Sequence, residues 1–250
     1  AIVAAQRQLW RVQWDNEFKE VYWRLVLNGL ATSERLHQQQ CRCVCGLLPG
    51  GLPPGRRHHF WDCSVAKCVV QAMQQQLVGW CRGRLCAYNV LCMEPPRRVD
   101  AAHTLHKGVW RVVCLAAVNA MDMGRRAACQ INVREKEQQG EVAAAQRAAA
   151  VPRGQRLITD MFQPAQLTPS QQQHQQQVRQ RQQLQEQQQQ QQQQQAAATQ
   201  LAEVQQQAVA HFWELLGDFV ALSAAPQSFL PQISPSHPFL HLTSDHDLRV

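Results

Sequence analysis

Cysteine and histidine side chains stand on both sides of a loop that cannot form a helix or a strand. The residues concerned are, before the loop, Cys41, Cys43 and Cys45, and after it, His58, His59 and Cys63. Residues 46–57 between them are rich in glycine and proline, which interrupt regular elements. Backbone pairing therefore does not hold the two ends of this loop together, and their side chains must do so.

A metal ion is the strongest link that these side chains allow. Twelve residues separate Cys45 from His58, and closing such a loop costs roughly 2 kcal/mol. Structural zinc contributes on the order of 10–16 kcal/mol in small sites, whereas the loop offers only three leucines for apolar packing. Because zinc prefers four tetrahedral thiolate and imidazole ligands, we predict a zinc site with the ligands Cys43, Cys45, His58 and Cys63.

The sequence leaves two alternatives open for the identity of the ligands. Cys41 could replace Cys43, and His59 could replace His58, because either exchange keeps two ligands on each side of the loop. The alternative without a metal is a group of free cysteines at the edge of a core, accompanied by surface histidines.

The order of motifs in this region resembles a known family. The chain carries Leu9-Trp10-Arg11, a segment from Trp23-Arg24-Leu25 to Arg35-Leu36 that contains Asn28-Gly29-Leu30, the cysteine pair, and the run His58-His-Phe-Trp-Asp-Cys63. This order is similar to the reverse-transcriptase zinc-binding domain of non-LTR retrotransposons. The resemblance covers residues 9–63 and fades near residue 80. One departure is clear: the family has Cys-x2-Cys, whereas this chain has Cys-x-Cys or Cys-x3-Cys.

The resemblance implies a zinc-binding module that accompanies a polymerase without catalysing a reaction itself. The paired-aspartate signature of a polymerase, a phosphate-binding glycine loop, a nucleophile-elbow serine and a His-Glu-x-x-His motif are all lacking in the sequence. We therefore expect no enzymatic activity and a role in assisting the binding of RNA or DNA.

Charge is distributed unevenly, which fits a polyanionic partner for the first part of the chain. Residues 1–160 hold 22 lysines and arginines against 12 acidic residues, and residues 161–250 hold 3 against 6. A basic region of this kind favours association with nucleic acid. The expected contact residues are Arg56, Arg57, Arg11, Trp10 and Trp14, whereas Trp23 and Trp110 are expected in the core.

Hydrophobic periodicity predicts an all-α fold with a zinc-stapled N-terminal unit, a disordered or loosely helical glutamine-rich spacer and a C-terminal helix. Helices are expected from about Phe18, from Thr32-Ser33 to about Gln40, over 65–80, over 101–123 with an end or kink at Gly124, and over 200–223. The last of these carries an apolar stripe that we expect to dock on the 101–123 helix. The predicted division is 1–80, zinc-binding-like; 81–135, a helical extension; 136–200, a Gln/Ala-rich spacer; 201–250, an amphipathic helix and Pro-rich tail.

The glutamine-rich tract and the 200–223 helix also support a second hypothesis, a protein-interaction scaffold in which zinc is purely structural. The absence of a secretory signal and of a bilayer-spanning segment predicts an intracellular protein of the nucleus or cytoplasm. In such a compartment cysteines are thiols or metal ligands. Cys68, Cys81, Cys86 and Cys92 could form a second metal cluster, but their loose spacing favours buried thiols, and Cys114 is expected in the core.

Overall fold

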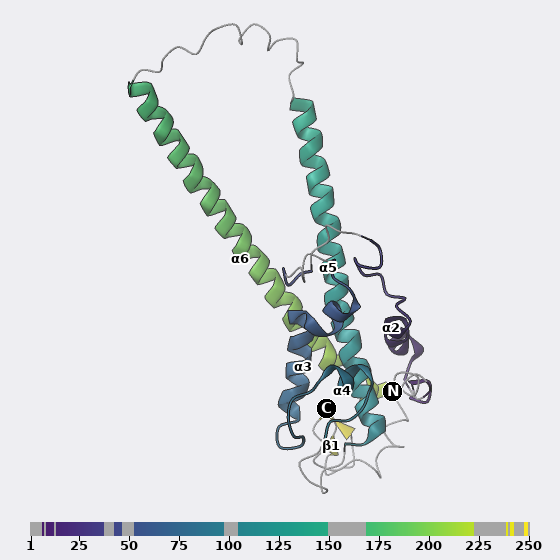
Figure 1. The fold of residues 1–250 in the computed structure, drawn as a ribbon. Coiled ribbons are helices and arrows are strands. Elements are labelled where there is room, and N and C mark those ends of the chain that lie inside the picture. Colours follow the sequence, from purple (N-terminus) through teal and green to yellow (C-terminus); the bar gives the residue numbers. More distant parts are fainter. Residues whose placement is uncertain are drawn as a thin grey trace. The chain divides into compact units, whose positions relative to one another are not determined.

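The computed structural model confirms a mainly helical chain (Figure 1). It describes residues 7, 9–12, 14–37, 43–46, 53–97, 105–149, 169–222, 239, 241–242 and 248–249. The elements, in chain order, are α2 (Asn16–Val26), the π-helical turn η2 (His58–Asp62), α3 (Ser64–Gln76), α4 (Ala87–Leu91), α5 (Lys107–Ala149), α6 (Pro169–Leu222), β1 (His241–Leu242) and β2 (Leu248–Arg249). The two short strands pair antiparallel, with His241 opposite Arg249 and Leu242 opposite Leu248.

The chain divides into two compact units. The first comprises residues 1–130 and 201–250, and the second comprises residues 131–200. The first unit contains the apolar core, in which side chains from α2, η2, α5 and the last part of α6 are fully buried. The largest of them are Trp110, Tyr22, Phe60, Phe212 and Phe219, and Phe239, which precedes β1, is buried with them. Cys114 and Trp110 lie in this core as expected.

Polar side chains join the helices of the core at three points. The Tyr22 hydroxyl donates to the carbonyl of Leu91 at 2.8 Å, which links α2 to α4. The indole of Trp110 donates to the carbonyl of Asn89 at 3.1 Å. The amide of Asn119 donates to the carbonyl of Phe18 at 2.8 Å, which links α5 to α2. Each bond satisfies a buried or half-buried polar group that would otherwise oppose folding.

Helix α5 differs from the prediction at Gly124. The sequence predicted an end or a kink there, but α5 continues from Lys107 to Ala149. The reason for the glycine is a close approach to α3, because a Cβ atom at Gly124 would lie 2.7 Å from Cγ1 of Val65. Glycine is therefore required at position 124 for the close packing of α5 against α3, and not for ending the helix.

The apolar stripe of the 200–223 segment is buried as predicted. Val204, Ala208, Phe212, Leu215, Leu216 and Phe219 belong to the core of the first unit. The preceding glutamine tract is helical and is part of the same element, α6, which begins at Pro169. Side chains 177–200 of this tract are exposed. Of the two states that the composition allowed, disordered or helical, the tract adopts the helical one.

The segment before the metal-ligand loop is a turn and not the predicted second helix. Thr32 does cap it, since its hydroxyl accepts from the backbone N–H of Arg35 at 3.3 Å. The N–H of Leu36 then donates to the carbonyl of Thr32 at 2.9 Å. His37 adopts a left-handed φ of 53°, which is incompatible with a continuing helix. Residues 38–40 lie outside the described part of the chain.

Two tryptophans exchange their predicted places. Trp14, expected at the surface, is buried with its ring centroid 4.7 Å from that of Phe18 and 5.3 Å from that of Phe219. Trp23, expected in the core, is 36% exposed and contacts Trp10 edge-on at a centroid distance of 6.0 Å. Trp10 is 49% exposed, as predicted. The aromatic surface near the N-terminus is therefore formed by Trp10 and Trp23.

None of the helices in the described ranges combines the length and the apolar character that a bilayer-crossing segment requires.

Candidate metal centre

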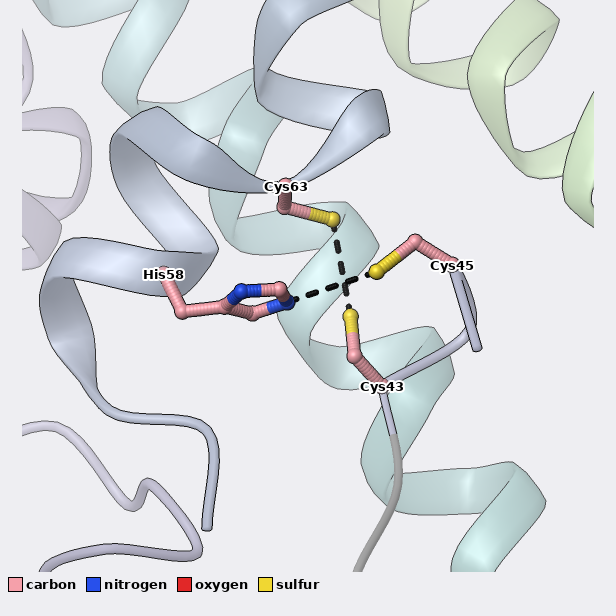
Figure 2. Close-up of side chains that lie close together, drawn as sticks. All are labelled: Cys43, Cys45, His58 and Cys63. Atoms are coloured by element: carbon pink, nitrogen blue, oxygen red, sulfur yellow. Dashed lines mark hydrogen bonds between the residues drawn. The ribbon is translucent and has the colours of Figure 1, made fainter. Parts of the chain in front are cut away.

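Two ligands of the candidate centre come from a tight turn. The backbone N–H of Gly46 donates to the carbonyl of Cys43 at 2.9 Å and closes a turn over residues 43–46. Gly46 has a φ of +70°, a conformation that side-chain-bearing residues rarely adopt. The turn brings Cys43 and Cys45 to the same side of the backbone, where both sulfurs face the other half of the site (Figure 2).

The other two ligands flank the π-helical turn η2. The N–H of Cys63 donates to the carbonyl of His58 at 2.7 Å, five residues back, and Cys63 is also the N-terminal cap residue of α3. In a regular α-helix, residues five apart lie about 140° apart around the axis. The wider turn reduces this separation, so the His58 imidazole and the Cys63 sulfur point toward the same site (Figure 2).

The four side chains form a compact group. Their ligand atoms all lie within 4.8 Å of one another. The Cys43 and Cys63 sulfurs are 3.5 Å apart, and the Cys45 sulfur is 3.4 Å from Nε2 of His58 (Figure 2). A tetrahedral ion with bonds of about 2.3 Å separates its ligands by about 3.8 Å. The spacing therefore fits one metal ion at the centre of the group.

Hydrogen bonding among the four side chains also favours a positive charge here. Cys43, His58 and Cys63 are buried, and Cys45 is half-buried. Hydrogen bonding with Cys45 and Cys63, followed by burial, raises the pKa of the Cys43 thiol far above its ordinary value. Hydrogen bonding with Cys45, followed by that with Cys63, raises the pKa of His58 to about 9. Sulfur crowded in this way is stabilised by a nearby positive charge, which either a proton or a metal ion supplies.

The alternative ligands have different positions. Nδ1 of His59 lies 4.0 Å from the Cys43 sulfur, but the four-atom group contains His58 and not His59. Burial, followed by the charges of His58 and Arg125, lowers the pKa of His59 to about 4. Cys41 falls outside the described residues.

A buried ion pair lies on α5 close to His59. Asp122 accepts from Nε of Arg125 at 2.6 Å and from Nε of Arg126 at 2.7 Å. The Arg125 guanidinium also donates to the carbonyl of Ala31 at 2.6 Å. Asp122 and Arg125 are buried, so the network ties α5 to the segment that leads into the first cysteine pair. The sequence patterns described above gave no indication of this ion pair.

The predicted nucleic-acid contact residues occupy varied environments. Arg56 and Arg57 are exposed at the start of η2. Arg56 donates to the carbonyls of Leu25 and Val26 at the end of α2, both at 3.3 Å. Arg57 pairs with Asp62 at 3.2 Å. Arg11 and Trp10 are exposed, and Trp14 is buried.

The other described cysteines do not extend the site. Across the described residues, the group of Cys43, Cys45, His58 and Cys63 is the one that meets the geometric requirement for a metal. Burial raises the pKa of the half-buried thiols of Cys68, Cys81 and Cys92. Cys86 is exposed, contrary to the expectation of a buried thiol, and contacts Oδ1 of Asn89 at 3.0 Å.

Comparisons of this chain with protein-family models, with curated proteins and with solved structures give no significant match.

Proposed function

We propose that this chain is a non-catalytic zinc-binding module of retrotransposon origin that assists the binding of RNA or DNA. The observation that carries the proposal is the convergence of four ligand atoms within 4.8 Å, from Cys43, Cys45, His58 and Cys63. Their order, a cysteine pair followed by His-x4-Cys, is the one that resembles the reverse-transcriptase zinc-binding domain.

Ligand chemistry supports zinc as the metal. Three thiolates and one imidazole form a Cys3His set, which is common in structural zinc sites, and soft sulfur ligands disfavour magnesium and calcium. A tetrahedral ion held by four protein ligands keeps no position for a substrate or an activated water. This closed coordination supports a structural role for the ion and a module without catalysis. The ion would join the 43–46 turn to the start of α3.

Exposed cationic and aromatic side chains support the nucleic-acid role. Arg57 lies next to the ligand His58 in the sequence, and its side chain is 86% exposed, so it can reach a phosphate while the metal holds its backbone. At the N-terminal aromatic surface, Trp10 is 49% exposed. Arginine contacts to phosphate and aromatic stacking on bases are the usual means of binding single strands.

Binding of a fluorescein-labelled single-stranded oligonucleotide is expected at low salt and should weaken steeply as salt is added. The double variant Arg56→Gln/Arg57→Gln should flatten the slope of log affinity against log salt by about 1.4, because each phosphate contact to a single strand contributes about 0.7. The matched control is Arg179→Gln/Arg181→Gln, which removes two exposed arginines from α6 and should leave the slope unchanged. Fluorescence anisotropy measures both quantities, and undetectable binding of RNA and of single-stranded DNA at low salt would refute the proposal.

Exposure of the glutamine tract favours the second candidate function, a protein-interaction scaffold. The apolar stripe of the 200–223 helix is buried in the chain's own core, so residues 177–200 of α6 are the part that a partner could cover. In this candidate the zinc is purely structural and nucleic acid is not bound.

Removing residues 178–195 distinguishes the two functions. The deletion takes out five complete turns of α6, so the buried stripe after it keeps its orientation around the helix axis. If the chain is a nucleic-acid module, anisotropy should show unchanged oligonucleotide affinity, and sedimentation should show an unchanged association state. Loss of self-association or of a co-purifying partner, with no oligonucleotide binding by either form, would favour the scaffold instead.

A further inference from the structure

A pocket of about 510 Å³ opens beside the metal-ligand segment. Its walls come from η2, from one face of α3 and from the loop that follows α3. The residues that carry its chemistry are Trp61, Lys67, Val70, Gln71 and Arg84. Small-molecule sites typically enclose about 300–1,000 Å³, so this pocket can hold a group the size of a nucleotide.

The charge of the pocket selects an anion. Lys67 and Arg84 line it and are exposed to solvent, and the described residues that line it include no carboxylate. The nearest acidic residue in sequence to Trp61 is Asp62, and its carboxylate pairs with Arg57. Two cations from different elements suit a phosphate group.

The remaining walls favour a flat heteroaromatic group attached to that anion. Trp61 is half-buried and packs against the core while it lines the pocket, which offers an aromatic surface. Val70 adds an apolar contact on the α3 side. Gln71 is exposed on α3, and its amide can both donate to and accept from the edge of a base. A nucleobase with its phosphate combines all of these requirements.

We propose that this pocket binds one nucleotide of a single-stranded nucleic acid, with Trp61 stacked on the base and Lys67 and Arg84 in contact with the phosphate. The inference rests on the proposed nucleic-acid function and specifies where a base is held.

The pocket is preorganised by Gln74. Lys67, Gln71 and Gln74 are spaced at i, i+4 and i+7 and therefore share one face of α3. The side chain of Gln74 accepts from the N–H of Leu85 at 2.6 Å and donates to the carbonyl of Gly83 at 3.3 Å. These two bonds hold the loop that carries Arg84 against α3, so little ordering is required when a ligand binds.

The metal centre determines the position of the aromatic wall. Trp61 lies within η2, between the ligands His58 and Cys63. An ion that fixes both ends of this turn also fixes the ring between them. Stacking at Trp61 is therefore expected to weaken when the metal is removed.

The test is the affinity of the full chain, purified with its metal, for fluorescein-labelled decaadenylate. Trp61→Leu should weaken binding about 5- to 150-fold, because base stacking contributes about 1–3 kcal/mol. Trp61→Phe retains an aromatic ring and should recover most of the affinity. Lys67→Gln/Arg84→Gln should flatten the salt slope by about 1.4. Arg82 is exposed in the same loop but does not line the pocket. The control variant Arg82→Gln should therefore change neither the affinity nor the salt slope.

A second titration compares AMP with ribose 5-phosphate and with hexaglutamate. Calorimetry measures the affinity for each ligand. Tighter binding of AMP than of the other two ligands, together with its loss in Trp61→Leu, supports the nucleotide assignment. Equal binding of the three would overturn it, because the pocket would then attract any anion, an acidic protein segment included.

If decaadenylate binds the native chain and the pocket variants with equal affinity and slope, the pocket inference fails while the proposed function stands. If AMP binds at Trp61 but no oligonucleotide binds, the proposed function fails and the pocket takes a free nucleotide instead. Circular dichroism of each variant verifies that the fold is retained.

Discussion

Cys63→Ser is expected to abolish the cooperative folding of the first unit, whereas Cys68→Ser should lower the free energy of unfolding by only about 1 kcal/mol. The two variants make the same chemical change five residues apart, at the N-terminal cap of α3 and within α3. Cys63 is buried and belongs to the four-ligand group, and Cys68 is half-buried outside it. The difference between them isolates the contribution of the metal.

The magnitude follows from the energy of a structural zinc ion. Zinc contributes on the order of 10–16 kcal/mol to small sites, which matches or exceeds the whole stability of an ordinary domain, about 5–15 kcal/mol. The 43–46 turn and the start of α3 have no β-sheet pairing to join them in the described structure. Losing one ligand therefore leaves three crowded sulfur and nitrogen groups without the ion that holds them.

Thermal unfolding followed by circular dichroism, with and without a strong chelator, measures this effect. The native chain and Cys68→Ser should both lose their cooperative transition when chelator is added, and Cys63→Ser should lack it from the start. Equal melting of the two variants, with no response to chelator, would contradict a structural metal.

Asp122→Asn is expected to lower the free energy of unfolding by about 3–5 kcal/mol, because it leaves the buried Arg125 guanidinium without its counter-charge. The Asp122 carboxylate accepts from Arg125 at 2.6 Å, and the side chains of these two residues are 2% and 9% exposed. Arg125 in turn donates to Ala31, 94 residues away. Loss of the pair therefore loosens the link between α5 and the segment before the metal site.

Arg126→Gln is the matched control for this network. Arg126 contacts the other oxygen of Asp122 at 2.7 Å, but its side chain is 66% exposed. Solvent screens that interaction, so its removal should cost at most about 1 kcal/mol. Urea unfolding of the two variants gives the comparison, and similar losses of stability in both would show that burial of Arg125 is not decisive.

The convergence of Cys43, Cys45, His58 and Cys63 could be predicted from the sequence because its chemistry is local. Cysteine and histidine are the residue types that zinc binds, and the Gly/Pro-rich loop marks the place where the chain returns. The spacing could not decide between His58 and His59, which lie five and four residues before Cys63. The π-helical form of η2 makes that decision, and a sequence carries no clear signal for a π turn.

Contacts between distant segments explain the predictions that were wrong. Trp14 is buried because Phe219, from the other end of the chain, packs against its ring. Gly124 is in mid-helix because Val65 of α3 lies against it. Asp122 and Arg125 form an i,i+3 pair inside an apolar run, a pattern that is a usable signal for a buried ion pair. The Trp61 pocket had a weaker signal, the i, i+4, i+7 spacing of Lys67, Gln71 and Gln74.

Metal content of the purified chain tests the central claim most directly. Elemental analysis of native protein should give one zinc per chain, and the double variant of His58→Ala and Cys63→Ser should give none. A native protein that holds no metal, and that keeps its helical content and melting temperature in chelator, would contradict the zinc centre and the function proposed from it.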